Sequence, residues 1–524
     1  MNIAQFLPQA GKPIAKPFTK PFTRPFTVLL TGLLSLNAIA QASSTGDDEV
    51  TAESPAELDE LVVTAGLAPL SARDVASSIT IITREDIEAR QVRFVADILR
   101  DVPGFSVNQS GGPGAQTQLR VRGAEANQML VLVDGVRAND AASTDEFQWQ
   151  YALTSDVERI EIVRGPQSAI WGSDAVGGVV NIIRRKGSTV NHLGGRAELG
   201  SFGTTDLALD GAWAGDNLRL RGGLSYYDTD GINASLVGSE KDGTENTSLS
   251  AGLEWQISEA LELLASMQAT DATSEFDDFD FFVTGLPQDA DRVTEAEQAY
   301  WRGELRFAPG DSIWSGNASL NYTDADNLNF SDGALNSRTA AETLEFRARG
   351  SALLEGARGG QHRFTAGLDY RQTDFLQRGI ATDFGDPNQD QSLDVTGLAA
   401  EYVGQPFAGL TWTVSGRHDS NSEFDDISTW QIALSHQVQE NVHVRGSYGT
   451  ASKAPTFTER FGFFEDFFLG NPDLKPEESR GYEFGVDTTW FDGVLSLGGA
   501  YFSTRLENEI NGFAFDPAQG AFTA

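Results

Sequence analysis

The chain has 524 residues, enough for more than one folding unit, and carries 75 acidic against 38 basic residues, a formal net charge of -37. Such acidity argues against nucleic acid as a partner, because phosphate binding needs basic patches. The absence of cysteine excludes disulfides, zinc–thiolate sites, iron–sulfur clusters and cysteine nucleophiles.

The first 42 residues are typical of a signal peptide. An apolar stretch from Phe26 to about Ala40 is followed by small-x-small cleavage sites at 38–40 and 40–42, and it is too short for a membrane span, which needs about 20 apolar residues. The positive charges that precede it are Lys12, Lys16, Lys20 and Arg24. The protein is therefore expected to be exported. No later stretch has 18 uninterrupted apolar residues, which excludes a helical membrane protein.

Residues 43–65 are predicted to be a flexible, acidic leader that ends in a short apolar, β-prone segment. Residues 66–188 predict a small α+β domain with an apolar core. Thr83 and Asp86 form a predicted capping box at the start of an amphipathic helix, which residues 94–99 continue and which Pro103 and Gly104 stop. Strands are predicted at 78–82, 118–123, 129–135, 157–163 and 179–183.

From residue 189 to 524 apolar and polar residues alternate, as in Trp430, Ile432 and Leu434. Strands with one apolar and one polar face predict a transmembrane antiparallel β-barrel with a water-lined interior. A soluble β-sandwich or β-helix fits less well, because a sandwich rarely needs so many strands. Connections alternate between short turns and long acidic loops, and aromatic residues near strand ends are typical of interface girdles: Trp213, Tyr226, Trp255 and Trp490.

Several long motifs, in order, carry a resemblance to a known family. They read DELVVTA at 59–65, LRDVPGFSV at 99–107, LRVRGAEANQMLVLVDGVRAND at 119–140 and DVERIEIVRGPQSAIWGSDAVGGVVNIIRRKG at 156–187. Later segments are SKAPTFTERFG at 452–462 and GNPDLKPEESRGYEFG at 470–485. Together they resemble TonB-dependent outer-membrane receptors, most closely the cobalamin (vitamin B12) transporter branch.

The resemblance implies a monomer in outer-membrane lipid, with residues 66–188 as a plug inside a barrel formed by residues 189–524. It also implies active import driven by the inner-membrane protein TonB. TonB would bind a segment that we call the TonB box, Asp59, Glu60, Leu61, Val62, Val63, Thr64 and Ala65, by adding it as a strand to its own sheet. Arg122 and Arg164 are expected to lie beside barrel carboxylates, where they either hold the plug in a releasable way or serve only as structural contacts.

No catalytic constellation and no nucleotide-binding loop stands out, so an enzyme is not expected and no cofactor is required. A passive pore or an adhesin is the other class, and deleting residues 59–65 should abolish uptake only in a TonB-driven importer. Cobalamin is the expected cargo and a ferric siderophore the alternative; a haem receptor fits less well, because residues 456–470 lack histidine. The candidate ligand-binding residues of the plug are Asn108, Gln109, Ser110, Gln116, Thr117 and Asn139, polar side chains suited to a neutral corrinoid.

The resemblance also implies calcium in the external loops, because the cobalamin branch orders its first long loops with calcium. Carboxylates gather in the comparable places, and calcium takes six to eight oxygen ligands. The candidate ligands are Asp242, Asp271, Asp277 and Asp278, among further acidic residues Glu240, Glu245, Glu275 and Asp280. The alternative is a generally acidic external surface.

The resemblance also carries one departure. Family barrels have about 22 strands and continue for roughly a hundred residues beyond the segment at 470–485, whereas this chain stops at Ala524. A barrel short of strands leaves unpaired backbone groups in lipid. We therefore expect the sequence to be truncated at its C-terminal side.

Overall fold

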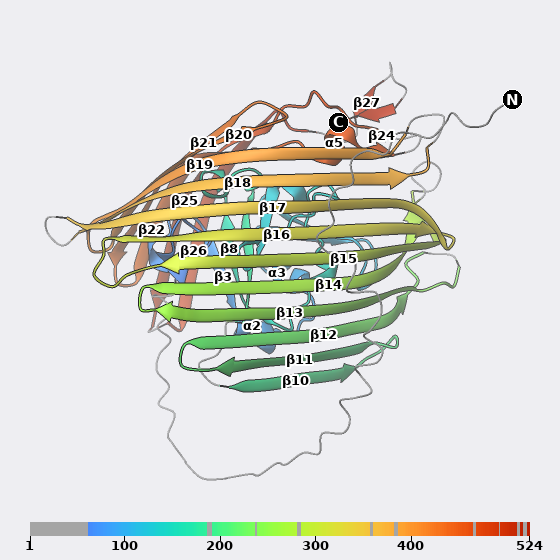
Figure 1. Ribbon diagram of the computed structural model, residues 1–524, viewed down its shortest axis with the longest axis horizontal. Helices are drawn as coiled ribbons and strands as arrows, with labels where there is room; N and C mark the ends of the chain where they lie inside the picture. The colour runs from blue at the N-terminus through green and yellow to red at the C-terminus, as the bar shows by residue number, and fades with distance from the viewer. Residues whose placement is uncertain are drawn as a thin grey trace, which may run out of the picture. The chain divides into compact units, whose positions relative to one another are not determined.

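The computed structural model describes residues 61–524, apart from short gaps at 186–190, 236–237, 280–284, 357–359, 382–385, 465–467, 492, 511–513, 517–520 and 524. The predicted signal peptide, most of the leader, Asp59, Glu60 and Asp280 lie outside the described residues. Residues from Glu57 onward belong to one unit, which contains a small mixed domain and a large curved sheet (Figure 1).

The small domain, the plug, extends from the first described strand to β9. Its elements are β1 (Leu61–Val62), β2 (Leu70–Ser71), η2 (Ala72–Asp74), β3 (Ile79–Thr83), α2 (Arg84–Arg90), α3 (Val95–Leu99), β4 (Phe105–Gln109), β5 (Thr117–Val121), η3 (Ala126–Gln128), β6 (Met129–Val133), β7 (Val136–Arg137), η4 (Trp149–Tyr151), β8 (Val157–Arg164), α4 (Ser168–Trp171) and β9 (Gly178–Arg184).

The core of the plug is a five-stranded sheet in the order β3-β8-β9-β6-β7, with α3 packed against it. The predicted helix start is confirmed, because the Thr83 side chain accepts from the Asp86 backbone and the Asp86 carboxylate accepts from the Thr83 backbone. Every residue of β6 and β9 is buried. Burial on both faces explains why these strands read as continuous apolar runs.

The large sheet has 15 antiparallel strands, each paired with its neighbours, and β10 and β26 are its edges. The strands are β10 (His192–Leu199), β11 (Thr205–Ala214), β12 (Leu218–Ile232), β13 (Asp242–Ser258), β14 (Leu261–Phe279), β15 (Pro287–Phe307), β16 (Trp314–Ser331), β17 (Ala334–Glu355), β18 (Gln361–Gly379), β19 (Gln389–Phe407), β20 (Leu410–Asn421), β21 (Ile427–Gln439), β22 (Val442–Lys453), β25 (Glu477–Trp490) and β26 (Leu495–Glu507). The loop after β22 contains α5 (Phe457–Phe461), and β23 (Phe463–Phe464) and β24 (Phe468–Leu469) pair with β27 (Ala514–Asp516) and β28 (Ala521–Thr523) in a small sheet.

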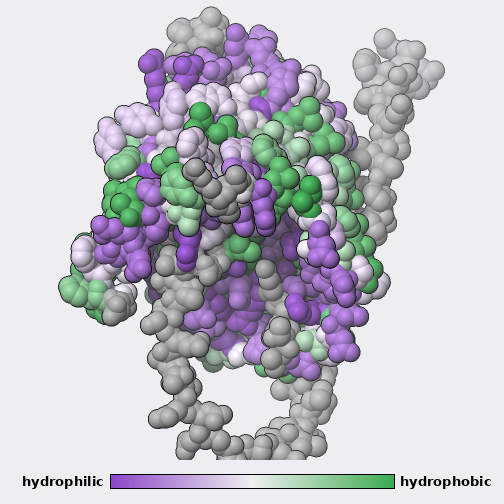
Figure 2. Space-filling view, turned by 90° about the vertical axis from the view of Figure 1, so that its left-hand side faces the viewer, coloured by the Kyte–Doolittle hydropathy of each residue, from purple (hydrophilic) through white to green (hydrophobic). Residues whose placement is uncertain are grey.

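The polarity of the two sheet faces is the reverse of that in a water-soluble protein: the outer face is apolar and the inner face is polar. In β21 the outward side chains of Trp430, Ile432 and Leu434 are exposed, while Thr429 and Gln431 are buried toward the plug. Figure 2 shows a hydrophilic recess behind a rim on which hydrophobic patches alternate with polar ones. An apolar outside and a polar inside are what lipid on one side and water on the other require, which confirms the predicted alternation.

Large aromatic side chains gather at the ends of the strands where the connections between strands are short. Trp213, Trp255, Trp314, Trp412 and Trp490 are all exposed there, beside the turns that follow or precede their strands. Aromatic rings at this level are typical of a membrane interface. None of the helices in the described part of the chain has the length and apolar character that a membrane crossing would need.

The plug lies on the concave, polar face of the sheet (Figure 1). Barrel side chains reach plug carbonyls directly: Arg347 donates to the Gly135 oxygen at 2.9 Å, and Asn246 donates to the Tyr151 oxygen at 3.1 Å. Such polar contacts between plug and barrel can be exchanged for water at little net cost, unlike an apolar core.

Candidate functional site: the plug and its contacts

The segment predicted to bind TonB is docked against the plug through one carboxylate. Glu161 of β8 accepts from the Val63 backbone at 3.0 Å, from the Thr64 backbone at 3.1 Å and from the Thr64 hydroxyl at 2.6 Å. Arg159 pairs with the other Glu161 oxygen at 2.7 Å and fixes its orientation. Hydrogen bonds to an ionised acceptor are stronger than neutral ones, so Glu161 is the main polar anchor of this segment.

Apolar packing holds the same segment from its other side. Val62 is buried with Leu70 and Val75 of the plug and with Val403 of β19. The next residues are held by a second carboxylate, because Glu401 of β19 accepts from the Leu67 backbone at 3.2 Å. The segment therefore bridges plug and barrel, and pulling on it acts on both.

Arg122 forms the expected ion pair between plug and barrel. Its guanidinium lies 2.5 Å from Glu483 of β25, which also accepts from the Ser78 hydroxyl. Arg164 differs from the expectation, since it donates within the plug to Pro103, Ile79 and Thr80. Burial, with Arg122 nearby, lowers the pKa of Arg164 to about 10, so it stays charged and stabilises the plug's own backbone carbonyls.

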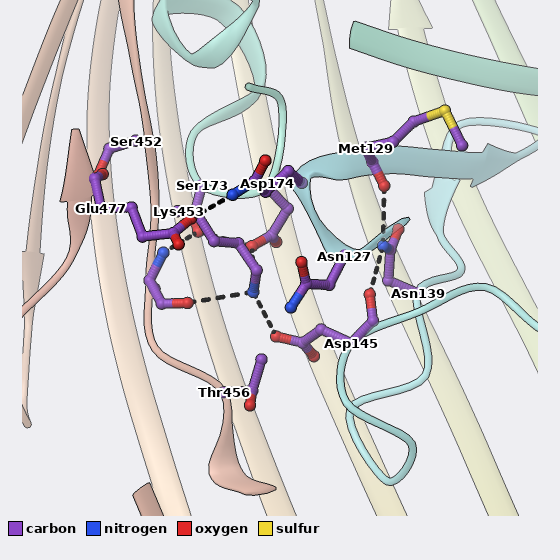
Figure 3. Close-up of polar contacts among 12 residues, drawn as sticks. Asn127, Met129, Asn139, Asp145, Ser173, Asp174, Ser452, Lys453, Thr456 and Glu477 are labelled. Atoms are coloured by element: carbon purple, nitrogen blue, oxygen red, sulfur yellow. Dashed lines mark hydrogen bonds and ion pairs between the residues drawn. The ribbon is translucent and has the colours of Figure 1, made fainter. Parts of the chain in front are cut away.

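A second ionic contact joins plug and barrel at the outer end of β22 (Figure 3). The ammonium of Lys453 lies 3.0 Å from Asp145 and 3.1 Å from Asp174, both in plug loops. Asp174 also pairs with Arg137 at 2.6 Å. Although burial alone would raise the pKa of Asp174, Lys453 and Arg137 hold it well below its usual range. Asp174 therefore stays ionised between its two cations.

A cavity opens beside this cluster, between the plug, α5 and the strands β17 to β19. We call it the outer cavity, because it lies toward the end of the sheet that carries the longer loops. Arg137, buried in the plug, reaches it, and burial lowers the pKa of Arg137 to about 10. Its lining includes Asn139, Thr373, Phe457 and the cations Arg371 and Arg460.

The predicted ligand-binding residues divide between two places. Asn139 lines the outer cavity, but its amide shapes a plug loop, because it donates to the Met129 and Asp145 carbonyls and accepts from the Val131 backbone. The other five lie at the β4–β5 hairpin, where Asn108, Gln109, Ser110 and Gln116 are exposed and Thr117 is buried. Within the described residues, no hydrogen bond or ion pair joins the Asn139 side chain to these five.

The β4–β5 hairpin loop approaches the barrel where β12 ends and β13 begins. Gly114 has a φ of +86° and lies against Thr244, so a Cβ there would be 2.4 Å from the threonine side chain. A Cβ at Gly112 would be 3.7 Å from Ile232, an ordinary contact distance. Only glycine fits at Gly114, and the hairpin tip is therefore held next to the loop between β12 and β13.

Carboxylates from the β12–β13 loop and from the adjoining ends of β14 and β15 converge beside that hairpin. Glu240, Asp277 and Asp289 place ligand oxygens within 4.8 Å of one another. Asp242 and Glu275 are near enough to act on the same charge, and burial together with these carboxylates raises the pKa of Glu240 to about 7. One buried oxygen each of Glu240, Asp242 and Asp277 has no hydrogen-bond partner.

The remaining predicted calcium ligands lie outside this group. Asp278 is paired with Arg292 at 2.7 Å. Asp271 is exposed on β14, opposite Thr247 and Glu297. Asp289, which sequence reasoning did not single out, belongs to the group instead.

Comparison with protein families identifies the architecture. Residues 71–179 match the TonB-dependent receptor plug domain, and residues 270–523 match the TonB-dependent receptor-like β-barrel. The two matches cover more than two thirds of the chain and fall on the plug and on the curved sheet from β14 onward. The chain belongs to the TonB-dependent receptors. Members of this family are outer-membrane transporters and not enzymes.

Relatives of this receptor are found among curated proteins and solved structures. The vitamin B12 transporter BtuB of Vibrio vulnificus is 29% identical over 466 residues, which is 86% of this chain and 71% of that protein. The siderophore receptor PirA of Acinetobacter baumannii is 18% identical with a TM-score of 0.69, covering 87% of this chain and 76% of that one. A ferric enterobactin receptor, PfeA of Pseudomonas aeruginosa, is 20% identical with the same TM-score, covering 85% and 75%. At such low identity these structures support the fold alone.

Sequence reasoning missed the partners that hold this receptor's plug in the barrel. Glu161, Trp171 and Lys453 all lie inside motifs that carry the family resemblance, yet their types alone do not indicate their partners. The usable signal was Lys453, the lysine of SKAPTFTERFG, which lies at the end of an amphipathic strand and is fully buried in the structure. A buried lysine needs carboxylates around it, and Asp145 and Asp174 supply them.

Proposed function

We propose that this receptor imports cobalamin across the outer membrane as a monomer in lipid, with TonB pulling on residues 59–65. The observation that carries the proposal is the 29% identity to a vitamin B12 transporter over most of this chain. Residues 66–188 act as the plug and residues 189–524 as the barrel. A ferric siderophore is the second candidate, supported by solved receptors of this fold that bind siderophores.

The docked segment supports the TonB part of the proposal. Leu61 and Val62 already lie in extended conformation, paired with Ser71 and Leu70 in a sheet of only two strands. A short strand of this kind can leave its partner and add to the sheet edge of another protein. Tension on it would be transmitted to Glu161 in the plug and Glu401 in the barrel.

A binding assay on the purified receptor tests the cargo. We expect cyanocobalamin to bind tightly and ferric siderophores to show no saturable binding, because a site matched to a large neutral ligand leaves its polar groups unpaired with a different one. Isothermal calorimetry with each ligand makes the measurement. Saturable siderophore binding without cobalamin binding would establish the second candidate.

We further propose that Glu240, Asp242, Asp277 and Asp289 hold one calcium ion. Partly buried carboxylates with unpaired oxygens repel one another unless a cation screens them, and hard oxygen ligands suit calcium. Gly238, with a φ of +88°, lies against Asp289, where a Cβ would be 2.0 Å from the carboxylate. Calcium bound there would fix the β12–β13 loop against the plug hairpin.

The raised pKa of Glu240 gives this proposal a pH signature. In the folded loop Glu240 keeps its proton up to about pH 7, whereas the ordinary value is 4.5. Without a cation, the stability of the loop should therefore be full below about pH 4.5 and fall as the pH rises to 7. Above pH 7, calcium should restore it, because the metal takes the ionised carboxylate.

Hydrogen-exchange protection factors of residues 238–243, measured in EDTA and in calcium at pH 5 and pH 8, check this expectation. Protection should be lowest in EDTA at pH 8. The variant Glu240→Gln, which removes the charge but keeps the shape, should lose both the pH dependence and most of the calcium effect. Equal protection with and without calcium at pH 8 contradicts the proposed site.

A further inference from the structure

Trp171, the last residue of α4, holds the TonB box from the plug's interior. Its indole N–H donates to the carbonyl oxygen of Thr64 at 2.8 Å. Thr64 is completely buried, so this carbonyl has no access to water. Leaving a buried carbonyl without its donor is unfavourable, and the docked position of Thr64 therefore depends on where Trp171 stands.

The backbone of the same tryptophan is bonded toward the outer cavity. Arg137 donates to the Trp171 carbonyl oxygen at 2.7 Å and to the Ser173 carbonyl oxygen at 3.1 Å. The same guanidinium pairs with Asp174, which Lys453 also contacts. Arg137 lines the outer cavity. Trp171 thus accepts a hydrogen bond from Arg137 in the cavity wall through its carbonyl oxygen, and it donates one to the TonB box through its indole ring.

The surroundings of Trp171 favour movement as a unit. The guanidinium of Arg347 lies 5.1 Å from the centre of the indole ring, a cation–π contact from the barrel. Gly172 follows with a φ of +77°, and a Cβ there would be 3.1 Å from Arg417. The turn from Trp171 to Asp174 is therefore tightly held. A displacement of the carbonyl groups that Arg137 holds is not absorbed by bending of the turn, and it moves the indole ring as well.

We propose that Trp171 is the positioning residue that couples the outer cavity to the docking of the TonB box. The proposal rests on the assignment of residues 59–65 as the TonB-binding segment. A ligand that draws Arg137 toward itself weakens the bond to the Trp171 carbonyl. The indole then shifts from Thr64, and the TonB box is released more often. The coupling needs no large change of the plug, only two hydrogen bonds on one residue.

The absence of cysteine from the chain allows a direct test. Val62 has 1% of its surface exposed, so the reporter variant Val62→Cys signals release when its introduced thiol reacts with a water-soluble maleimide. In isolated outer membranes, adding Trp171→Phe should raise the labelling rate of this thiol about fivefold, the usual effect of losing one hydrogen bond. The matched control, Trp149→Phe, changes a buried plug tryptophan that packs against Phe147 and should leave the rate unchanged.

The other end of the coupling is tested by Arg137→Gln in the same reporter. It should raise the labelling rate as well, although the bonds of the Arg137 guanidinium go to Trp171, Ser173 and Asp174 and not to the TonB box. The double variant with Trp171→Phe should be no faster than the faster single variant, because both remove the same connection. An unchanged rate in Arg137→Gln, or multiplied effects in the double variant, would overturn the proposal.

Unfolding of the plug is separated from release by a second reporter, Val95→Cys, at a core position with 0% exposure. The thiol introduced at this core position should stay unreactive in every variant, and its labelling alongside the thiol of Val62→Cys would also overturn the proposal. The assay contains neither TonB nor cargo. A failure of the cobalamin assignment therefore leaves its result unaffected, and a failure of the coupling leaves cobalamin binding intact.

Discussion

Replacing Leu61 by proline is expected to reduce uptake to the level of cells that lack TonB, while ligand binding stays unchanged. Addition of the TonB box to the sheet of TonB needs backbone N–H groups, and proline removes one of them. The Leu61 side chain is 56% exposed, so its loss disturbs little packing in the docked state. Uptake and surface binding of labelled cargo, measured on the same cells, check this expectation.

The matched control is Leu61→Ala, which shortens the same side chain but keeps the N–H. It should retain most of the uptake. If Leu61→Pro imports cargo as fast as Leu61→Ala, transport does not depend on strand addition at this segment, and a passive pore would be favoured instead.

Much of this fold could be predicted from the sequence because its signals are local. The alternation of Trp430, Ile432 and Leu434 with Thr429 and Gln431 follows from the two faces of one strand. The two members of the capping box, Thr83 and Asp86, are only three positions apart. Neither needs knowledge of distant residues, and both are confirmed.

The contacts of the candidate site are long-range, and the sequence does not show which distant residues form them. Thr64 and Glu161 are 97 residues apart, and Asp145 and Lys453 are 308 apart. Arg122 and Arg164 have the same chemistry, yet only Arg122 is placed to form an ion pair with a barrel carboxylate, while Arg164 donates to plug carbonyls. The residue type predicted that both arginines would form polar contacts inside the protein, but it did not predict which groups would be their partners.

The acidic loops show the same limit in another form. Asp271 and Asp277 are both on β14, but six residues of strand cover about 20 Å. Asp271 therefore cannot share an ion with Asp277, however close the two stand in the sequence. A register shift between Phe276 and Asp278 then changes the strand's alternation near Asp277, a feature that composition does not reveal.

Replacing Lys453 by methionine is expected to cost the closed plug about 3–5 kcal/mol, the usual effect of removing one partner from a buried ion cluster. Only 2% of the lysine side chain is exposed, and its loss leaves Asp145 without a cation. Methionine keeps the length of the side chain, so the change isolates the charge. Hydrogen exchange of the turn at 172–175 should accelerate by about 100-fold or more.

Two comparisons separate this effect from a general loss of stability. Lys241→Met removes an exposed lysine whose ion pair with Asp230 has side chains 55% and 62% exposed, and it should change exchange little, since such pairs contribute less than about 1 kcal/mol. The double variant Lys453→Met, Asp145→Asn should recover part of the lost protection, because the carboxylate that was left unpaired is gone. Equal exchange in Lys453→Met and the unchanged receptor would mean that the cluster does not hold the plug closed. The other ion pairs between plug and barrel, such as Arg122–Glu483 and Asp134–Arg221, would then carry that role.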